Sequence, residues 1–398
     1  MKNAFFYFIF CPFIGFIQAI KNYRSSWAKP TIIAFVAFFG LSMVKNDTVD
    51  SSRYIQKLEV MHASNKSFEN LQASFYDETD GQADIYVPLV TYLFSLFTVN
   101  GNLLFLFYGL VFGYFYANNI WLVLGESQGR LRWEQFLLLA TFSMIIGFWD
   151  VNGVRMHTAA HVFFYGSFIY LYHNKKKGLL IAACSMLVHF SFILPFGLLV
   201  LYSLVRLNYR FLYFFYVASF FIAELNVPII RTTLESYAPG FLLPKVTTYL
   251  SDGYIEVITD EYSNANWYAV YYLKILSYFN LIFVSILFFK AKLSLPSSKL
   301  LGFSLFFLAV ANIASLLPSG SRFLAVALLF SIALLFIEVA KNSEPVLTKN
   351  VKKLSIILVF FCIVSIRILF NYFNLTTLTN PIVVAFTNIN VPLIDLIK

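Results

Sequence analysis

Apolar runs of roughly 15 to 22 residues follow one another along most of this chain, and short polar segments separate them. Runs of this length match α-helices that cross a hydrocarbon core about 30 Å thick. The alternation typical of a membrane β-barrel is absent. Because 59% of the residues are hydrophobic and only 12% are charged, a soluble globular fold is excluded. We therefore predict one all-α, polytopic membrane domain over residues 1–398, a bundle of roughly 11–13 spans.

The first candidate span is followed by basic residues and by a second run, without a small-residue cleavage site, so we interpret it as a retained helix. Two long polar segments, 46–84 and 228–266, are predicted to be outer loops. The candidate spans cover residues 4–20, 30–45, 85–99, 102–124, 134–150, 155–172, 178–204, 210–227, 267–289, 300–317, 322–339 and 354–371.

Lysines and arginines predict the orientation of the bundle, because short loops rich in these residues stay in the cytoplasm. In the second half, the basic loops around Lys292 and Lys349 are expected inside, which places the turn before Arg322 outside. In the first half, the loops around Arg130 and Lys176 also require an inside position. If every apolar run crossed the membrane once, these basic loops could not all lie inside.

Two topologies remain open. In the one we favour, 85–99 is short, contains Pro88 and dips into the membrane without crossing it. The long run 178–204, which Pro195 breaks, then bends back or forms two short helices, and Arg155 faces outside. In the alternative, twelve simple crossings place Arg155 inside and the lysine triplet after residue 174 outside.

The formal net charge of +9 does not indicate nucleic-acid binding, because the cations lie in short loops where they orient helices. Cys11, Cys184 and Cys362 stand singly in apolar runs and predict no redox role. No phosphate-binding or dinucleotide-binding glycine motif occurs in a usable setting. We therefore predict no cofactor.

Arg155 opens the helix that follows Asp150, and the small residues Thr158 and Ala159 lie on its face. An arginine with small neighbours at a membrane surface can hold a phosphate through two parallel hydrogen bonds. The alternative is an arginine that extends to lipid headgroups. Arg322 faces the same side in the favoured topology, and two outward arginines point to a doubly charged phosphate ligand.

The histidines allow several roles. His157 and His161 lie four positions apart on a face roughly opposite Arg155, but no third ligand accompanies them, so we predict no metal site. His161 is expected to hydrogen-bond between helices, while His157 could reach a substrate near the membrane surface. His189, two residues before Ser191, must face protein or a water-filled cavity. It could act as a base or form a hydrogen-bonded bridge between helices.

Two carboxylates, Asp80 and Asp84, lie at the end of the first outer loop, where the chain re-enters the membrane before Tyr86. A carboxylate there could deprotonate or orient a hydroxyl group, although a solvated loop carboxylate is the alternative. Aromatic residues interleaved with acids in 228–266 suit sugars, whose C–H faces stack on rings. An interfacial aromatic belt is the alternative for any one of them.

Three segments together resemble the EpsG family of Wzy-like polysaccharide polymerases, and the resemblance covers most of residues 75–340. Its most specific part is the arginine at 155 with the later His-x-Ser. The chain departs from the family's pattern at Val154 and at Met156-His157, so the family supports no role for His157. The segments are Thr79-Asp80 leading to Tyr86, then Asn152-Gly-Val-Arg155-Met-His-Thr-Ala159 with Val188-His189-Phe-Ser191, and Gly320-Ser-Arg322-Phe-Leu-Ala.

The resemblance implies a multi-pass glycosyltransferase of the bacterial cytoplasmic membrane, which could be GT-C-like. Such an enzyme joins undecaprenyl-pyrophosphate-linked oligosaccharide units on the outer side, for an O-antigen, a capsule or an exopolysaccharide. Arg155 and Arg322 would bind the pyrophosphate, and Asp80, or else His189, would act on the attacking hydroxyl. A flippase and a chain-length regulator are the protein partners that it would allow. The secondary site residues are Asp84, Tyr86, His157 and Ser191.

Other classes of membrane protein compete with this interpretation. In a lipid-linked oligosaccharide flippase or a solute transporter, the same arginines would line a translocation cavity. Polar residues at the outer ends of spans argue against it, since transporters tend to place their sites near the midplane, but His189 beside Pro195 favours it. A ligase or acyltransferase with a lipid-linked donor is a third class. The acyltransferase is the weaker of these two, because the sequence predicts no His-Asp pair at a helix mouth.

Overall fold

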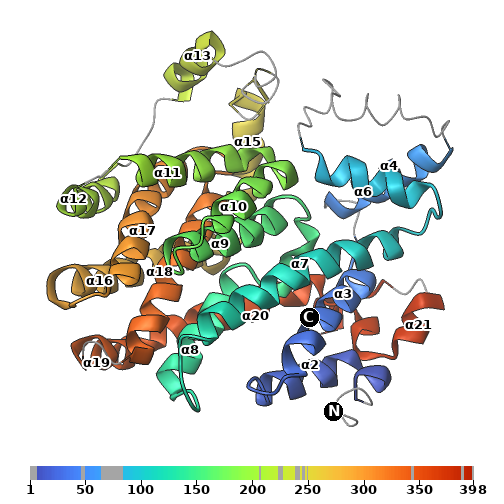
Figure 1. Cartoon of the computed structure of the whole chain (residues 1–398). Helices are drawn as coiled ribbons and strands as arrows, with labels where there is room; N and C mark the ends of the chain where they lie inside the picture. The colour runs from blue at the N-terminus through green and yellow to red at the C-terminus, as the bar shows by residue number, and fades with distance from the viewer. Residues whose placement is uncertain are drawn as a thin grey trace.

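The protein is a bundle of α-helices (Figure 1). The computed structural model describes residues 7–45, 50–63, 84–205, 208–222, 227–237, 243, 247–248, 250–341, 345–386 and 390–396. Within these residues there is one isolated β-bridge, between Asn374 and Pro392, and otherwise only helices, turns and bends. The predicted all-α fold is therefore confirmed.

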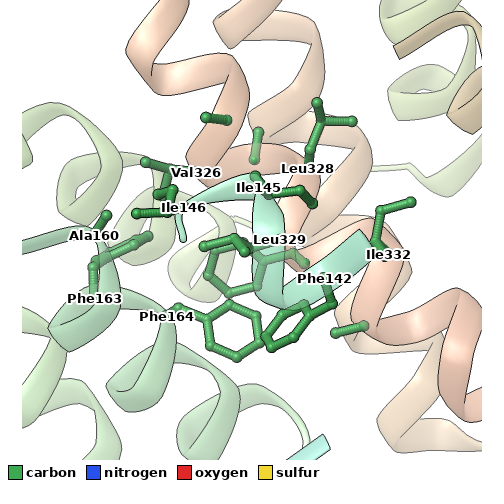
Figure 2. Packing of buried hydrophobic residues seen from close by; sticks show 14 of the residues in the cluster. Phe142, Ile145, Ile146, Ala160, Phe163, Phe164, Val326, Leu328, Leu329 and Ile332 are labelled. Carbon is green, nitrogen blue, oxygen red and sulfur yellow. The ribbon is translucent and has the colours of Figure 1, made fainter. Parts of the chain in front are cut away.

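Helix α18 (Ser321–Lys341) lies at the centre of the bundle, and every residue from Leu324 to Val339 is buried. An α-helix that is apolar all round its surface is stable only when other elements surround it. Figure 2 shows side chains of α18 packed between those of α8 (Trp133–Ile145) and α9 (Met156–Leu171), with Phe164 against Phe142. Helices α16 (Trp267–Lys290) and α17 (Leu295–Ala314) cover other sides of α18.

Helices α9 and α10 (Lys177–Val188) approach each other closely, and this contact matters because the residues around them form the candidate site. A β-carbon at Gly166 of α9 would overlap the backbone nitrogen of Ala182, and one at Gly178 would overlap the carbonyl oxygen of Gly166. Only glycine permits two backbones to come so near. The relative position of the two helices is therefore fixed at this crossing.

Six helices among the described residues are long and apolar enough to cross a membrane. Shorter apolar helices lie beside them, including α3 (Ala28–Ser42), α10 and α6 (Tyr86–Ser95). The prediction of a multi-pass membrane protein is confirmed. The six helices are Gly101–Leu124 (α7), Trp133–Asn152 (α8 with the short helix η1, Phe148–Asn152), Trp267–Lys290, Leu295–Ala314, Ser321–Lys341 and Ser355–Tyr372 (α20).

The basic loops of both halves lie at the same end of the bundle, which we call the basic end. Lys341 donates a hydrogen bond to the hydroxyl of Tyr172 (2.7 Å), and Lys299 donates to Oδ1 of Asn174 (3.2 Å). Arg132 donates to the carbonyl of Val339 (2.8 Å). Lys175–Lys177 therefore share an end with Lys341, and the positive-inside rule assigns this end to the cytoplasm. The topology with twelve simple crossings, which separates these loops, is wrong.

The run 178–204 is two helices, α10 and α11 (Ile193–Leu204), joined by the short helix η2 (Phe190–Phe192). The hydroxyl of Tyr202 donates to the carbonyl of Lys299 (3.0 Å), so α11 returns to the basic end from which α10 starts. The break lies at His189 rather than at Pro195, which sits in the first turn of α11, where a proline is tolerated.

Helix α6 spans only ten residues, about 15 Å, and packs against α4 (Asp50–Ala63), side by side with it in Figure 1. This agrees with the prediction that 85–99 does not cross. The two predicted outer loops differ from expectation in containing helices: α4 in the first, and α13 (Val227–Tyr237) and α15 (Asp252–Asn264) in the second. The remaining helices are α2 (Pro12–Lys21), α12 (Tyr209–Ser219), α19 (Pro345–Lys353), η4 (Leu375–Leu378), α21 (Pro381–Phe386) and η5 (Leu393–Leu396).

Cysteine labelling tests this topology. We expect a membrane-impermeant maleimide to label Asp260→Cys in intact cells but to label Lys176→Cys only in broken cells, since these exposed positions lie at opposite ends. The background protein carries serine at its three native cysteines, Cys11, Cys184 and Cys362, and serves as the unlabelled control. Labelling of Lys176→Cys in intact cells would contradict the assignment of the basic end to the cytoplasm.

Candidate functional site

Three side chains from distant parts of the sequence meet at the end opposite the basic end, and we call them the Asp84 cluster. Oδ2 of Asp84 accepts a hydrogen bond from Nη1 of Arg155 at 2.8 Å and lies 3.1 Å from Nδ1 of His189. The Asp84 side chain is fully buried, whereas 22% of the Arg155 side chain and 13% of the His189 side chain are exposed. A buried carboxylate thus holds two partly accessible nitrogen groups.

Local backbone structure explains why this carboxylate is buried here. Helix α10 ends at Val188, and His189 has an extended conformation (φ −148°, ψ 117°) before η2 begins. The N–H of Phe190, at the start of a new helical stretch, lacks a partner inside the helix, and it donates to Oδ1 of Asp84 at 2.6 Å. The N–H of Ile85 also donates to the carbonyl of Leu187 (3.1 Å), which ties the two chains together.

The surroundings keep Asp84 ionised. Burial raises the pKa of Asp84, but the hydrogen bond and charge of His189, the charge of Arg155 and the N–H of Phe190 outweigh burial. The pKa therefore lies well below its ordinary value of 3.8. Because the pKa is lower in the folded protein than in the unfolded chain, this cluster stabilises the fold fully above the unfolded value. Its contribution is lost as the pH falls toward the folded value.

Tyr54 of α4 also reaches the cluster, and its hydroxyl accepts a hydrogen bond from Nε of Arg155 at 3.0 Å. Tyr54 was not among the predicted site residues, because the segment 46–84 was predicted to be a loop. A signal was present in the sequence: Ser51, Tyr54 and Leu58 follow helical spacing, and all three are buried in the structure.

Arg322 lies in the first turn of α18, exposed at the same end as the cluster. The ring of the next residue, Phe323, is 6.4 Å from the ring of Phe192 in η2, which places this turn beside the break in the α10–α11 hairpin. Within the described part of the chain, the Arg322 guanidinium has no ion pair or hydrogen bond. A positive charge therefore remains available at the same end of the bundle as the Asp84 cluster.

Two predicted residues near the cluster have other surroundings. The hydroxyl of Tyr86 is buried without a hydrogen-bond partner among the described residues, and its ring lies 5.7 Å from that of Tyr108. The hydroxyl of Ser191 lies 3.9 Å from the sulfur of Met156, beside Arg155. Asp80, our first candidate base, lies outside the described residues.

The two histidines of α9 are not part of the cluster. Nδ1 of His157 lies 2.9 Å from the carbonyl oxygen of Asp150 in η1. The amide of Asn119 in α7 donates to the carbonyl of His161 (3.0 Å) and lies 3.2 Å from its Nδ1. His161 thus bridges two helices, as predicted. No group of three metal-ligating side chains occurs among the residues described.

Two interpretations of the sequence need correction. The acyltransferase was discounted because no His-Asp pair was expected at a helix mouth, but His189 and Asp84 form such a pair. Arg155 was pictured beside small residues of its own helix, whereas its guanidinium donates to Asp84 and to Tyr54 from other segments. These hydrogen bonds hold the guanidinium of Arg155 in place before any ligand binds.

The geometry defines the chemistry that the cluster can perform. An ionised carboxylate next to Nδ1 favours the histidine tautomer that carries its proton there, which leaves the lone pair on Nε2 as the basic site. A carboxylate that orients a histidine in this way also stabilises the imidazolium formed when the histidine accepts a proton. Arg155 and Arg322 supply positive charge for an anion. An imidazole nitrogen that can accept a proton and two guanidinium groups therefore lie at one end of the bundle.

Comparison of the chain with family models, with curated protein sequences and with solved structures gave no match.

Replacement of Asp84 by asparagine should destabilise the protein, because it removes the charge that balances a largely buried arginine. We expect a loss of about 3 kcal/mol in the free energy of unfolding, which is typical of a broken buried ion pair. The matched control is Asp252→Asn, which breaks the ion pair with Arg231, where the Asp252 side chain is 85% exposed. That change should cost less than about 1 kcal/mol. Thermal unfolding in detergent measures both, and equal losses would contradict the role of Asp84.

Proposed function

We propose that this protein is a Wzy-like polymerase, which joins undecaprenyl-pyrophosphate-linked oligosaccharide units at the outer face of the bacterial cytoplasmic membrane. The observation that carries the proposal is the Asp84 cluster, in which one buried carboxylate holds an arginine and a histidine at the end opposite the basic loops. Glycosyl transfer from a pyrophosphate needs a cation and a base close together. Arg155 and His189 supply this combination.

The pyrophosphate leaves with the electron pair of the anomeric C–O bond, so negative charge grows on its oxygens as the bond breaks. Arginine donors aimed at these oxygens stabilise the transition state more than the ground state. In this proposal Arg155 binds the pyrophosphate. Arg322 adds the net positive charge that Arg155, paired with Asp84, does not provide alone. A polyprenyl chain attached to the pyrophosphate would lie in the lipid beside the bundle.

The acceptor is a sugar hydroxyl of a second lipid-linked unit. Its oxygen forms the new bond to the anomeric carbon, and its proton passes to Nε2 of His189. Asp84 holds Nδ1 and balances the charge of the resulting imidazolium. No metal or nucleotide takes part in these steps. A flippase that delivers the units and a chain-length regulator are the protein partners consistent with this role.

A second candidate is acyl transfer, which the Asp84–His189 pair favours because a carboxylate-oriented histidine is a base for a hydroxyl acceptor in that chemistry too. A flippase or transporter is favoured by the helix break at His189. Neither candidate accounts for two arginines at the outer end as directly as a pyrophosphate leaving group does. A glycan assay separates the three candidates.

The first variant to test is Arg155→Ala, at matched protein level, in a strain whose surface glycan depends on this protein. We expect the glycan ladder on a gel to collapse to a single repeat unit, because units still reach the surface but are not joined. Arg231→Ala, which removes an outer arginine of α13 from its ion pair with Asp252, should keep the ladder. Loss of every band with lipid-linked units retained inside indicates a flippase, and an unchanged ladder contradicts the proposal.

The base is tested with His189→Gln, whose amide can still hydrogen-bond to Asp84 but is not basic. We expect the rate of polymerisation to fall by a factor of about 100 or more, the usual contribution of a general base. The thermal unfolding midpoint should change much less than in Asp84→Asn. A ladder of normal length and amount in this variant would show that His189 only bridges the helices.

A further inference from the structure

Tyr54 and Asp84, two residues of the first outer loop, both accept hydrogen bonds from Arg155. The side chain of Tyr54 is buried, and its ring lies 6.4 Å from that of Tyr108 and 6.5 Å from that of Phe105 in α7. These contacts fix the phenol ring. Its hydroxyl is therefore a rigid acceptor rather than a mobile one.

Helix α4 is itself held firmly against its neighbours. It buries Leu58 one turn after Tyr54 and packs along α6. Near its end, Nδ1 of His62 lies 2.6 Å from the carbonyl oxygen of Ser95, the last residue of α6. Since Asp84 lies two residues before α6, the α4–α6 pair carries two acceptors of hydrogen bonds from Arg155. The placement of Arg155 thus depends on how this pair is docked.

Two acceptors on different nitrogens orient a planar guanidinium better than one. A bond from Nη1 to Asp84 alone leaves the guanidinium able to pivot about that contact. A second bond, from Nε to Tyr54, fixes the plane. The phenol is uncharged, so it orients the arginine without cancelling more of its positive charge. A carboxylate in the same place would weaken the attraction for an anion.

We infer that Tyr54 is a positioning residue, which orients Arg155 toward the pyrophosphate of the lipid-linked substrate and makes α4 part of the substrate site. This inference rests on the proposed function. The first outer loop then contributes to binding of the leaving pyrophosphate.

The test uses the full-length protein in lipid nanodiscs, with inorganic pyrophosphate as the probe and the thermal unfolding midpoint as the readout. Pyrophosphate should raise the midpoint of the wild type. Tyr54→Phe keeps the ring but removes the acceptor, and should need about ten times more pyrophosphate for the same rise, equivalent to about 1.4 kcal/mol. Tyr108→Phe is the matched control, because it removes a buried hydroxyl that bonds to Thr91 in the same aromatic group. Its pyrophosphate dependence should equal that of the wild type.

A second pair of variants separates positioning from packing. In Arg155→Lys the side chain lacks Nε, so Tyr54→Phe should have no further effect on the pyrophosphate dependence in that background. Equal behaviour of Tyr54→Phe and Tyr108→Phe, or a full additional loss in the Arg155→Lys background, would overturn the inference and leave the proposed function standing. If pyrophosphate did not raise the unfolding midpoint of the wild type, and Arg155→Ala left the glycan ladder unchanged, the proposed function itself would be overturned.

Discussion

Burial of the Asp84 carboxylate is the constraint on which the outer end of the molecule depends. An ionised carboxylate removed from water is costly unless charges and hydrogen bonds replace its hydration. Here the replacements come from Arg155, His189 and the N–H of Phe190, which are 71 to 106 residues distant in the sequence. The helices that carry them must therefore meet in one arrangement. The same contacts that offset the cost of burial also bring an arginine and a histidine together.

The apolar bundle provides the rigid frame that this arrangement needs. Helix α18 is surrounded on all sides, so close apolar packing holds its neighbours along most of its length. The glycine crossing at Gly166 and Gly178 then fixes α9 against α10. Because Arg155 precedes α9 and His189 follows α10, this crossing sets the distance between them. Close packing of the apolar helices therefore positions the side chains of Arg155 and His189 at one end of the bundle.

Much of the fold could be predicted from the sequence, because apolar runs and basic loops are local signals. The distribution of basic residues also predicted that 178–204 bends back or forms two short helices, although the break lies at His189 and not at Pro195. Arg155, His189 and Arg322 were found because charged groups are rare in membrane segments. Tyr54 and the central position of Asp84 were not predicted. Nothing local in the sequence marks them, because their contacts are with Arg155, which is far away in the sequence.

The position of the helix break bears on the choice between an enzyme and a carrier. In transporters, broken helices usually place their ends near the midplane, where a ligand can be reached from either side in turn. Here α10 and α11 both run to the basic end, as the bond from Tyr202 to Lys299 shows, so the break between them lies at the other end of the bundle. The break also has a local cause, since it frees the N–H of Phe190 for Asp84. A break that anchors a buried carboxylate holds the Asp84 cluster at one end of the bundle, and this position supports the proposed enzyme more directly than a carrier with a site at the midplane.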